Sequence, residues 1–151
     1  MPTRRELLFS IAAVAILLLP AAFFSLRAQS GPSDRQFTAR DYAGTWDFML
    51  NGKPFATMVL KQNGDGFTGA ITNCTLDMDN DGHITGATPG EGYTPIVSTS
   101  LMQNGLRIVQ KDGDDETEWE MTLLSATRAE MRMAGENAPA VADAIALVKV
   151  Q

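Results

Sequence analysis

The amino-acid sequence predicts an all-β fold, an antiparallel up-and-down meander of eight or nine strands that closes into a small barrel. From residue 42 onward, apolar and polar side chains repeatedly alternate with the period of two that is typical of strands with one buried face. Turn sequences rich in Asn, Asp and Gly separate these runs at short intervals. Strands joined by such short turns pair with their neighbours along the chain, which favours a barrel, with a sandwich as the alternative.

The first 30 residues are expected to form an export segment, as an N-terminal helix ahead of the barrel. Arg4 and Arg5 precede a long apolar run that ends in small residues, which is the pattern of a secretory signal peptide. Cleavage is expected after Ser30, or alternatively after Ala28. The apolar run is also long enough to remain as a membrane anchor. The arginine pair suits the twin-arginine route as well as the general secretory route, and either route leads to a periplasmic or extracellular domain.

Residues 31–40 are polar and contain Gly, Pro and Ser, so a linker is expected there, followed by one domain over residues 41–151. The chain has 12 basic and 18 acidic side chains, and the part after residue 30 keeps 9 and 17 of them, a net charge of −8. A negative surface repels nucleic-acid backbones and anionic lipid head groups. We therefore expect no nucleic-acid partner, and contact with a membrane only through an uncleaved N-terminal segment.

The first three strands are separated by turns whose residues accept positive φ values at low cost, of which Asn63-Gly64-Asp65-Gly66 is the stronger signal. The first strand alternates cleanly, whereas the second is apolar on both faces and its inward side stays open. Within the third strand, Gly69 indicates a bulge or a bend. Cys74 is the single cysteine, so it cannot form an internal disulfide, and a buried small side chain is expected there. In order, strands are expected at residues 42–51, 55–62, 67–78, 83–87, 95–103, 106–111, 117–124, 128–133 and 145–150.

The middle of the chain is expected to hold a loop at residues 88–94, because Gly and Pro are frequent there. Asn104-Gly105 is the clearest two-residue hairpin turn. In the strand at 117–124, Trp119, Met121 and Leu123 share one face and polar side chains take the other. The strand at 128–133 alternates in the same way, so both strands are predicted to have one dry face and one wet face.

The C-terminal part is expected to form a short helix at residues 137–143 and then a closing strand at 145–150. A final strand can pair with the first strand and so remove two exposed sheet edges. One helix that continues through Val148 is the alternative, because Val141, Ile145 and Val148 also match helical spacing.

Gly44-Thr45-Trp46, which opens the first strand, resembles the start of calycin proteins, the group of lipocalins, avidin-like proteins and small bacterial lipocalin-like domains. The resemblance covers this motif and the first three strands. It implies a small β-barrel in which Trp46 packs across the closed end. Avidin-like biotin sites need several tryptophans on later strands, and this chain has only Trp46 and Trp119, so biotin is not the expected ligand.

Asp77, Asp79 and Asp81 alternate and are followed by Gly82, as in the first half of a calcium-binding loop. Carboxylates at alternate positions can converge on one hard cation, and the carbonyl group of His83 would be the next ligand. The alternative is a hairpin turn that needs Asn, Asp and Gly for its backbone conformation. Calcium at Asp77, Asp79, Asp81 and His83 is therefore one of two hypotheses for this turn, and no other cofactor is expected.

Methionine is frequent for a domain of this size, and methionine both fills irregular cores and lines adaptable apolar cavities. The sequence thus favours a non-enzymatic, exported module that binds a small apolar or amphipathic ligand in the barrel. The alternative is a structural or protein-interaction module with a filled core, which calcium at Asp77, Asp79 and Asp81 would stabilise. An enzyme ranks third because no catalytic constellation is recognisable. Residues expected to line the ligand are Trp46, Phe48, Met58, Met102, Trp119, Met121 and Met131.

Overall fold

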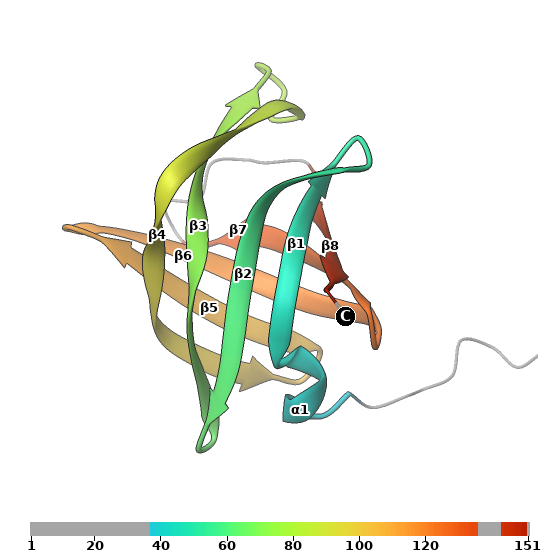
Figure 1. Cartoon of the computed structure of the whole chain (residues 1–151), viewed down its shortest axis with the longest axis vertical. Coiled ribbons are helices and arrows are strands. Elements are labelled where there is room, and N and C mark those ends of the chain that lie inside the picture. Colours follow the sequence, from blue (N-terminus) through green and yellow to red (C-terminus); the bar gives the residue numbers. More distant parts are fainter. Residues whose placement is uncertain (1–36, 136–142, 151) are drawn as a thin grey trace, which may run out of the picture. The chain divides into compact units, whose positions relative to one another are not determined.

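The computed structural model describes residues 37–135 and 143–150, which contain one short helix and eight strands (Figure 1). The helix and strands are α1 (Ala39–Tyr42), β1 (Gly44–Leu50), β2 (Lys53–Asn63), β3 (Gly66–Met78), β4 (Ile84–Met102), β5 (Gly105–Asp112), β6 (Asp115–Ser125), β7 (Arg128–Ala134) and β8 (Ile145–Lys149). Within these two ranges no helix has the length and hydropathy of a membrane span.

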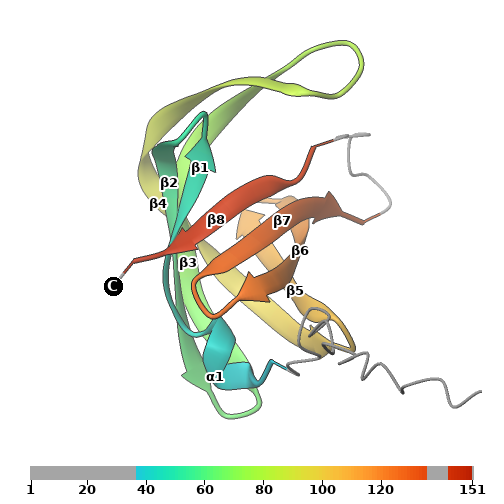
Figure 2. The same ribbon diagram turned by 90° about the vertical axis from the view of Figure 1, so that its right-hand side faces the viewer.

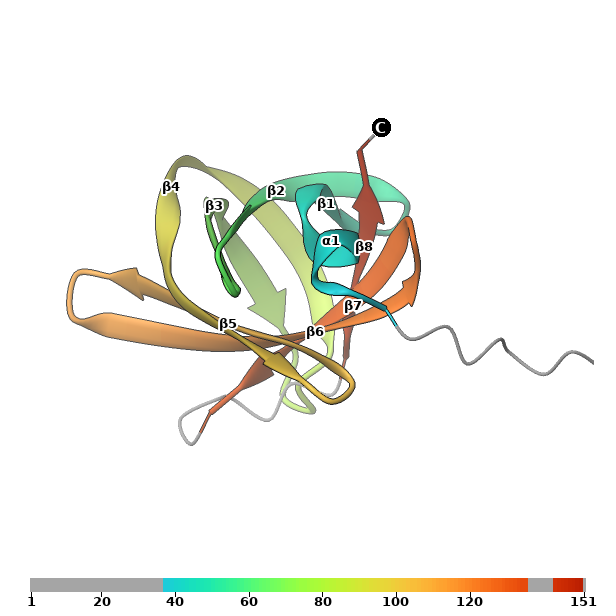
Figure 3. The ribbon, with the colours of Figure 1, turned by 90° about the horizontal axis from the view of Figure 1, so that it is seen from below.

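The eight strands form a closed antiparallel barrel in which each strand pairs with the next along the chain. β8 pairs with β1, with Phe48 opposite Leu147, and this pairing closes the barrel (Figure 3). The predicted meander and the predicted closing strand are therefore confirmed. The alternative of a helix through Val148 is wrong, because pairing with β1 and β7 gives this segment two sheet neighbours.

β4 is one strand of 19 residues, whereas the sequence predicted a short strand, a loop at 88–94 and a second strand. β3 pairs with β4 along most of this length, and a register shift between Thr72 and Cys74 accommodates the irregular part. The Asn73 side chain supports the shift, because it donates to the Glu91 carbonyl oxygen and accepts from the Thr94 hydroxyl group. Pairing of β4 with β5 starts only at Ile96, so the prolines before it lie on a strand edge, where proline is tolerated.

The short helix lies near the start of the domain and not near the C-terminus. α1 begins within the stretch predicted as a linker, and the Asp41 carboxylate accepts hydrogen bonds from the Thr38 amide and hydroxyl groups. Phe37 and Ala39 pack against the core. The helix expected at 137–143 falls mainly on residues 136–142, which lie outside the described residues, and Asp143 itself is not helical.

The hydrophobic core contains the dry faces predicted for the first strand and for the strands at 117–124 and 128–133. On β2 the inward face is that of Ala56, Met58 and Leu60. Gly69 lies in continuous pairing with Leu60, so the bulge predicted at Gly69 is wrong, and the register shift falls after Thr72 instead. The largest fully buried side chains are Trp46, Met58, Leu60, Leu106, Ile108, Met121, Met131 and Leu147.

Candidate ligand-binding site

One end of the barrel is closed by α1 and by Trp46, whose side chain has no exposed surface. The Trp46 indole N–H donates to the Tyr42 carbonyl oxygen at 2.8 Å. The Lys149 ammonium group lies 5.0 Å from the centre of the Trp46 ring and donates to the Asp41 carbonyl oxygen at 2.9 Å. These contacts join α1, β1 and β8 and leave the indole with its polar atom satisfied. We call this the closed end.

The other end of the barrel holds a cavity of about 420 Å³. In an up-and-down barrel the last residues of β1, β3, β5 and β7 and the first residues of β2, β4, β6 and β8 lie at the end opposite α1. The lining residues come from these parts of the strands. Most of the inner lining is apolar, and the polar lining residues come mainly from β3 and from the β5–β6 hairpin. The lining residues are Phe48, Phe55, Ile71, Thr72, Asn73, Cys74, Leu76, Met78, Thr94, Gln110, Asp112, Asp115, Thr117, Trp119, Met133 and Ile145.

Trp119 is the largest aromatic side chain in the cavity wall and is 9% exposed. Its indole N–H donates to the Gln110 side-chain oxygen on the neighbouring strand β5 at 2.6 Å. The hydrogen bond satisfies the polar atom of the indole, so the ring is held in place as an apolar surface. Trp119 can therefore contact a ligand without leaving an unpaired N–H group.

The predicted lining residues divide between the cavity and the packed core. Phe48 and Trp119 lie in the cavity wall, and their contact with a ligand stays a prediction. Met102 is 37% exposed at the far end of β4. The remaining four are fully buried in the core and do not line the cavity; they are Trp46, Met58, Met121 and Met131.

Sequence reasoning missed several apolar side chains of the cavity wall. Phe55, Ile71, Leu76, Met133 and Ile145 all belong to the strand parts near the end opposite α1. A signal for them is present in the sequence. In a meander, the residues beside every second connection lie at the same end of the barrel. The position of a residue along its strand therefore predicts whether it lines the cavity better than its residue type does.

The hairpin of β3 and β4 extends beyond its neighbours, and we call residues 72–95 the β3–β4 arm. β2 pairs with β3 only up to Met58 opposite Ile71, and β5 pairs with β4 only from Ile96 on. Between those limits the arm pairs only with itself. It rises from the barrel wall and bends over the cavity end (Figure 2). A second hollow of about 380 Å³ lies between β2 and the arm, lined by Thr57 and Asn73 among others.

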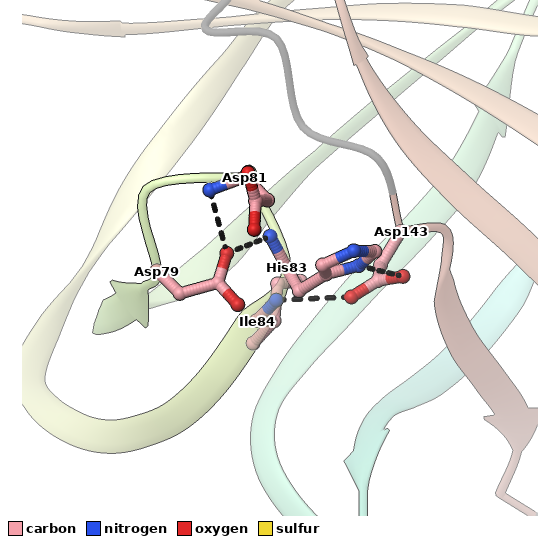
Figure 4. Close-up of polar contacts among 5 residues, drawn as sticks. All are labelled: Asp79, Asp81, His83, Ile84 and Asp143. Atoms are coloured by element: carbon pink, nitrogen blue, oxygen red, sulfur yellow. Dashed lines mark hydrogen bonds and ion pairs between the residues drawn. The ribbon is translucent and has the colours of Figure 1, made fainter.

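The tip of the arm is attached to Asp143, which lies two residues before β8 (Figure 4). One carboxylate oxygen of Asp143 lies 3.2 Å from His83 Nδ1, and the other accepts the Ile84 amide N–H at 3.0 Å. The hydrogen bond and the charge of Asp143 raise the pKa of His83 above its ordinary value, with a smaller effect from Asp79. The hydrogen bonds from Ile84 and His83 lower the pKa of Asp143.

The turn proposed as a calcium loop is built on its own hydrogen bonds. Asp79 Oδ1 accepts the amide N–H groups of Asp81 and His83 at 3.0 and 2.8 Å. The His83 carbonyl oxygen, which calcium would need, accepts the Asp79 amide N–H at 3.0 Å. Among the described residues, no group of three or more His, Cys, Asp or Glu side chains is placed to hold a metal ion. Calcium at Asp77, Asp79, Asp81 and His83 stays a prediction.

Cys74 lies in the cavity wall and its side chain is exposed, so the expected burial is wrong. It lies next to the register shift of β3, in the part of the strand that does not pair with β2. Although water reaches the sulfur, desolvation by the surrounding wall raises the pKa of the thiol. A raised pKa leaves less of the reactive thiolate at neutral pH, so Cys74 is expected to react more slowly than a free cysteine.

We expect a maleimide reagent to label Cys74 more slowly than it labels a free cysteine peptide at pH 7.5. The labelling rate should rise with pH up to a higher midpoint than that of the peptide, because the reactive form is the thiolate. The rate is measured by mass spectrometry of the intact chain, which has one cysteine. The same chain in denaturant is the control and should follow the peptide profile; equal rates in the folded and denatured chains would contradict the prediction.

Comparison of the chain with protein-family models, with curated proteins and with solved structures finds no match.

Proposed function

We propose that this protein is an exported, non-enzymatic binding module that holds a small apolar or amphipathic molecule in the cavity opposite α1. The observation that supports it is the cavity of about 420 Å³. Ligand-binding pockets have volumes of about 300–1,000 Å³ and mostly apolar walls. This cavity lies within that range of volume, and nine of its sixteen lining residues are apolar side chains or Cys74, the other seven being polar. Export rests on residues 1–30, which lie outside the described residues.

The barrel architecture is consistent with this proposal. An eight-stranded barrel is just wide enough to be filled by its own side chains or to hold one small ligand. Here the half next to α1 is filled by large, fully buried side chains, and the other half contains the cavity. The finer resemblance to lipocalin-like barrels belongs to the same proposal.

The charges at the cavity indicate the chemistry of the polar part of the ligand. Asp112 and Asp115, in the β5–β6 hairpin, are the charged residues that line the cavity. Two carboxylates disfavour an anionic head group and favour a neutral or cationic one. We therefore expect an apolar body within the wall of Phe48, Phe55 and Trp119, with a neutral or amine head group toward the polar rim.

N-phenyl-1-naphthylamine, an uncharged fluorescent probe, is expected to bind the exported domain and to be displaced by long-chain amines and alcohols better than by fatty acids. Met133→Ala should weaken probe binding by about three- to tenfold, because it removes part of the cavity wall. Met102→Ala is the matched control, because Met102 lies outside the cavity, and it should bind like the parent.

Fluorescence of the two tryptophans locates the probe. Energy transfer to the probe should quench the emission of the Trp46→Phe variant, which keeps Trp119, more than that of the Trp119→Phe variant. Absence of any probe binding, or equal losses in the Met133 and Met102 variants, would overturn the proposed site. The structural or protein-interaction module would then be the better hypothesis.

A further inference from the structure

We propose that the β3–β4 arm is a lid over the cavity, held shut by the contacts of His83 and Ile84 with Asp143, and that ligands pass beneath it between β2 and the arm. The role of the lid in ligand exchange rests on the proposed function, because it requires that the cavity is a binding site. The opening and closing of the arm can be measured without any ligand.

The first support is the position of the arm between the cavity and solvent. Five of the residues that line the cavity belong to its β3 strand, namely Thr72, Asn73, Cys74, Leu76 and Met78. Across the cavity they face wall residues of β1, β2 and the β5–β6 hairpin. Displacement of the arm would therefore open the cavity on the side that β3 covers.

The second support is the pairing of the strands. Sheet pairing that would hold the arm to the barrel ends at Ile71 on the β2 side and at Ile96 on the β5 side. At the first of these limits the Thr57 amide N–H donates to the Thr72 hydroxyl group at 2.8 Å instead of continuing the ladder. The arm keeps its own antiparallel pairing, so it can move as one unit about residues 71–72 and 95–96.

The third support is the attachment at the tip. β4 and β8 are separated by β5, β6 and β7 on one side and by β1, β2 and β3 on the other, so they lie on opposite sides of the barrel. The two hydrogen bonds to Asp143 thus span the cavity end (Figure 4). Leu76, Ile84 and Ala87 are only partly buried against the core, so closure combines a modest apolar contact with this polar attachment.

The charged groups around the attachment determine how it responds to pH. Asp79 and Asp81 lie in the same turn as His83, Asp143 approaches from the start of β8, and Arg132 on β7 acts on Asp143. Because the pKa of His83 is raised, its protonated form favours the closed arm below about pH 6.5 and this contribution is lost as the pH rises through the raised value. Because the pKa of Asp143 is lowered, its carboxylate is lost only in strong acid.

The lid itself is tested first, in the untagged domain without ligand. His83 is the only histidine of the chain, so its imidazole resonances report its titration directly by nuclear magnetic resonance. Asp143→Asn should lower the pKa of His83 and speed amide hydrogen exchange within the arm by about two- to fivefold, since an exposed ion pair shifts an equilibrium only modestly. Ile108, in the core, should be unaffected. An unchanged His83 titration together with unchanged exchange in the arm would overturn the lid.

Ligand exchange is tested second, with N-phenyl-1-naphthylamine in stopped flow. The probe should dissociate about two- to fivefold faster at pH 9 than at pH 6. In His83→Gln and Asp143→Asn this pH dependence should disappear, with the fast rate at both values, whereas Asp65→Asn in the β2–β3 turn at the closed end should behave like the parent. If the probe binds but its dissociation rate does not change with pH, in His83→Gln or in Asp143→Asn, the lid is overturned and the proposed function stands. A responsive arm without probe binding overturns the proposed function alone.

Discussion

Trp46→Ala is expected to lower the free energy of unfolding by about 3–5 kcal/mol, the usual effect of removing a large aromatic side chain from a core. Trp46 is fully buried, so its removal leaves a void that the surrounding strands cannot fill without moving. The substitution also leaves the Tyr42 carbonyl oxygen without its indole donor and removes the ring beneath Lys149. Small domains are stable by only about 5–15 kcal/mol, so the loss is a large part of the total.

The measurement for Trp46 is denaturant unfolding followed by circular dichroism. Trp46→Phe keeps most of the aromatic volume but removes the indole N–H group, so it distinguishes the effect of packing from that of the hydrogen bond. It should lower the free energy of unfolding by about 1–2 kcal/mol, because the Tyr42 carbonyl oxygen loses its donor. Val97→Ala is the control for an apolar side chain that is 52% exposed, and it should change stability by less than about 0.5 kcal/mol. A Trp46→Ala variant with parental stability would show that the closed end is not packed around this ring.

Gly69→Ala is expected to destabilise the domain by about 3 kcal/mol, the upper part of the range for overpacked sites. Gly69 lies opposite Leu60 where β3 crosses close to β2, and an added methyl group would overlap the Val59 carbonyl oxygen. Backbone atoms cannot rotate away as a flexible side chain can, so the two strands must separate and weaken their pairing.

Gly113→Ala is the matched control for Gly69→Ala. No atom lies within 4 Å of an added methyl group at Gly113, and the cost comes from its φ of 61° alone. Residues with a side chain pay about 1 kcal/mol for that conformation. Equal unfolding midpoints of the two variants in urea would mean that the close approach of β2 and β3 at Gly69 is absent.

The sequence was a good guide to the fold where one face of a strand is buried and the other is wet. The alternation around Trp46, Trp119 and Met131 follows from that contrast, and all three side chains are buried. It was a poor guide at residues 88–94, because Gly and Pro are equally compatible with a loop and with a strand edge that lacks a second neighbour. Whether a loop or an edge strand forms at residues 88–94 depends on how far β5 extends along β4. The local sequence does not predict that length.

The candidate site could be predicted only in part for a similar reason. Phe48 and Trp119 were found because large aromatic side chains on a dry face must point into the barrel. Met58, Met121 and Met131 point inward too, whereas Met102 is exposed. Whether an inward residue faces packed atoms or an open space depends on its height along the barrel. The attachment of His83 to Asp143 joins residues 60 positions apart, across a barrel whose closure must be known first.

The cavity wall contains both core residues and residues that are only partly buried or exposed. Phe48, Phe55, Ile71, Trp119 and Ile145 belong to the buried core, whereas Leu76, Met78 and Met133 are not fully buried, so substitutions at these last three positions should remove fewer core contacts. Substitutions in the less buried part of the cavity wall could therefore change which ligand the domain binds, in evolution or in the laboratory. The packing around Trp46 at the closed end would remain unchanged.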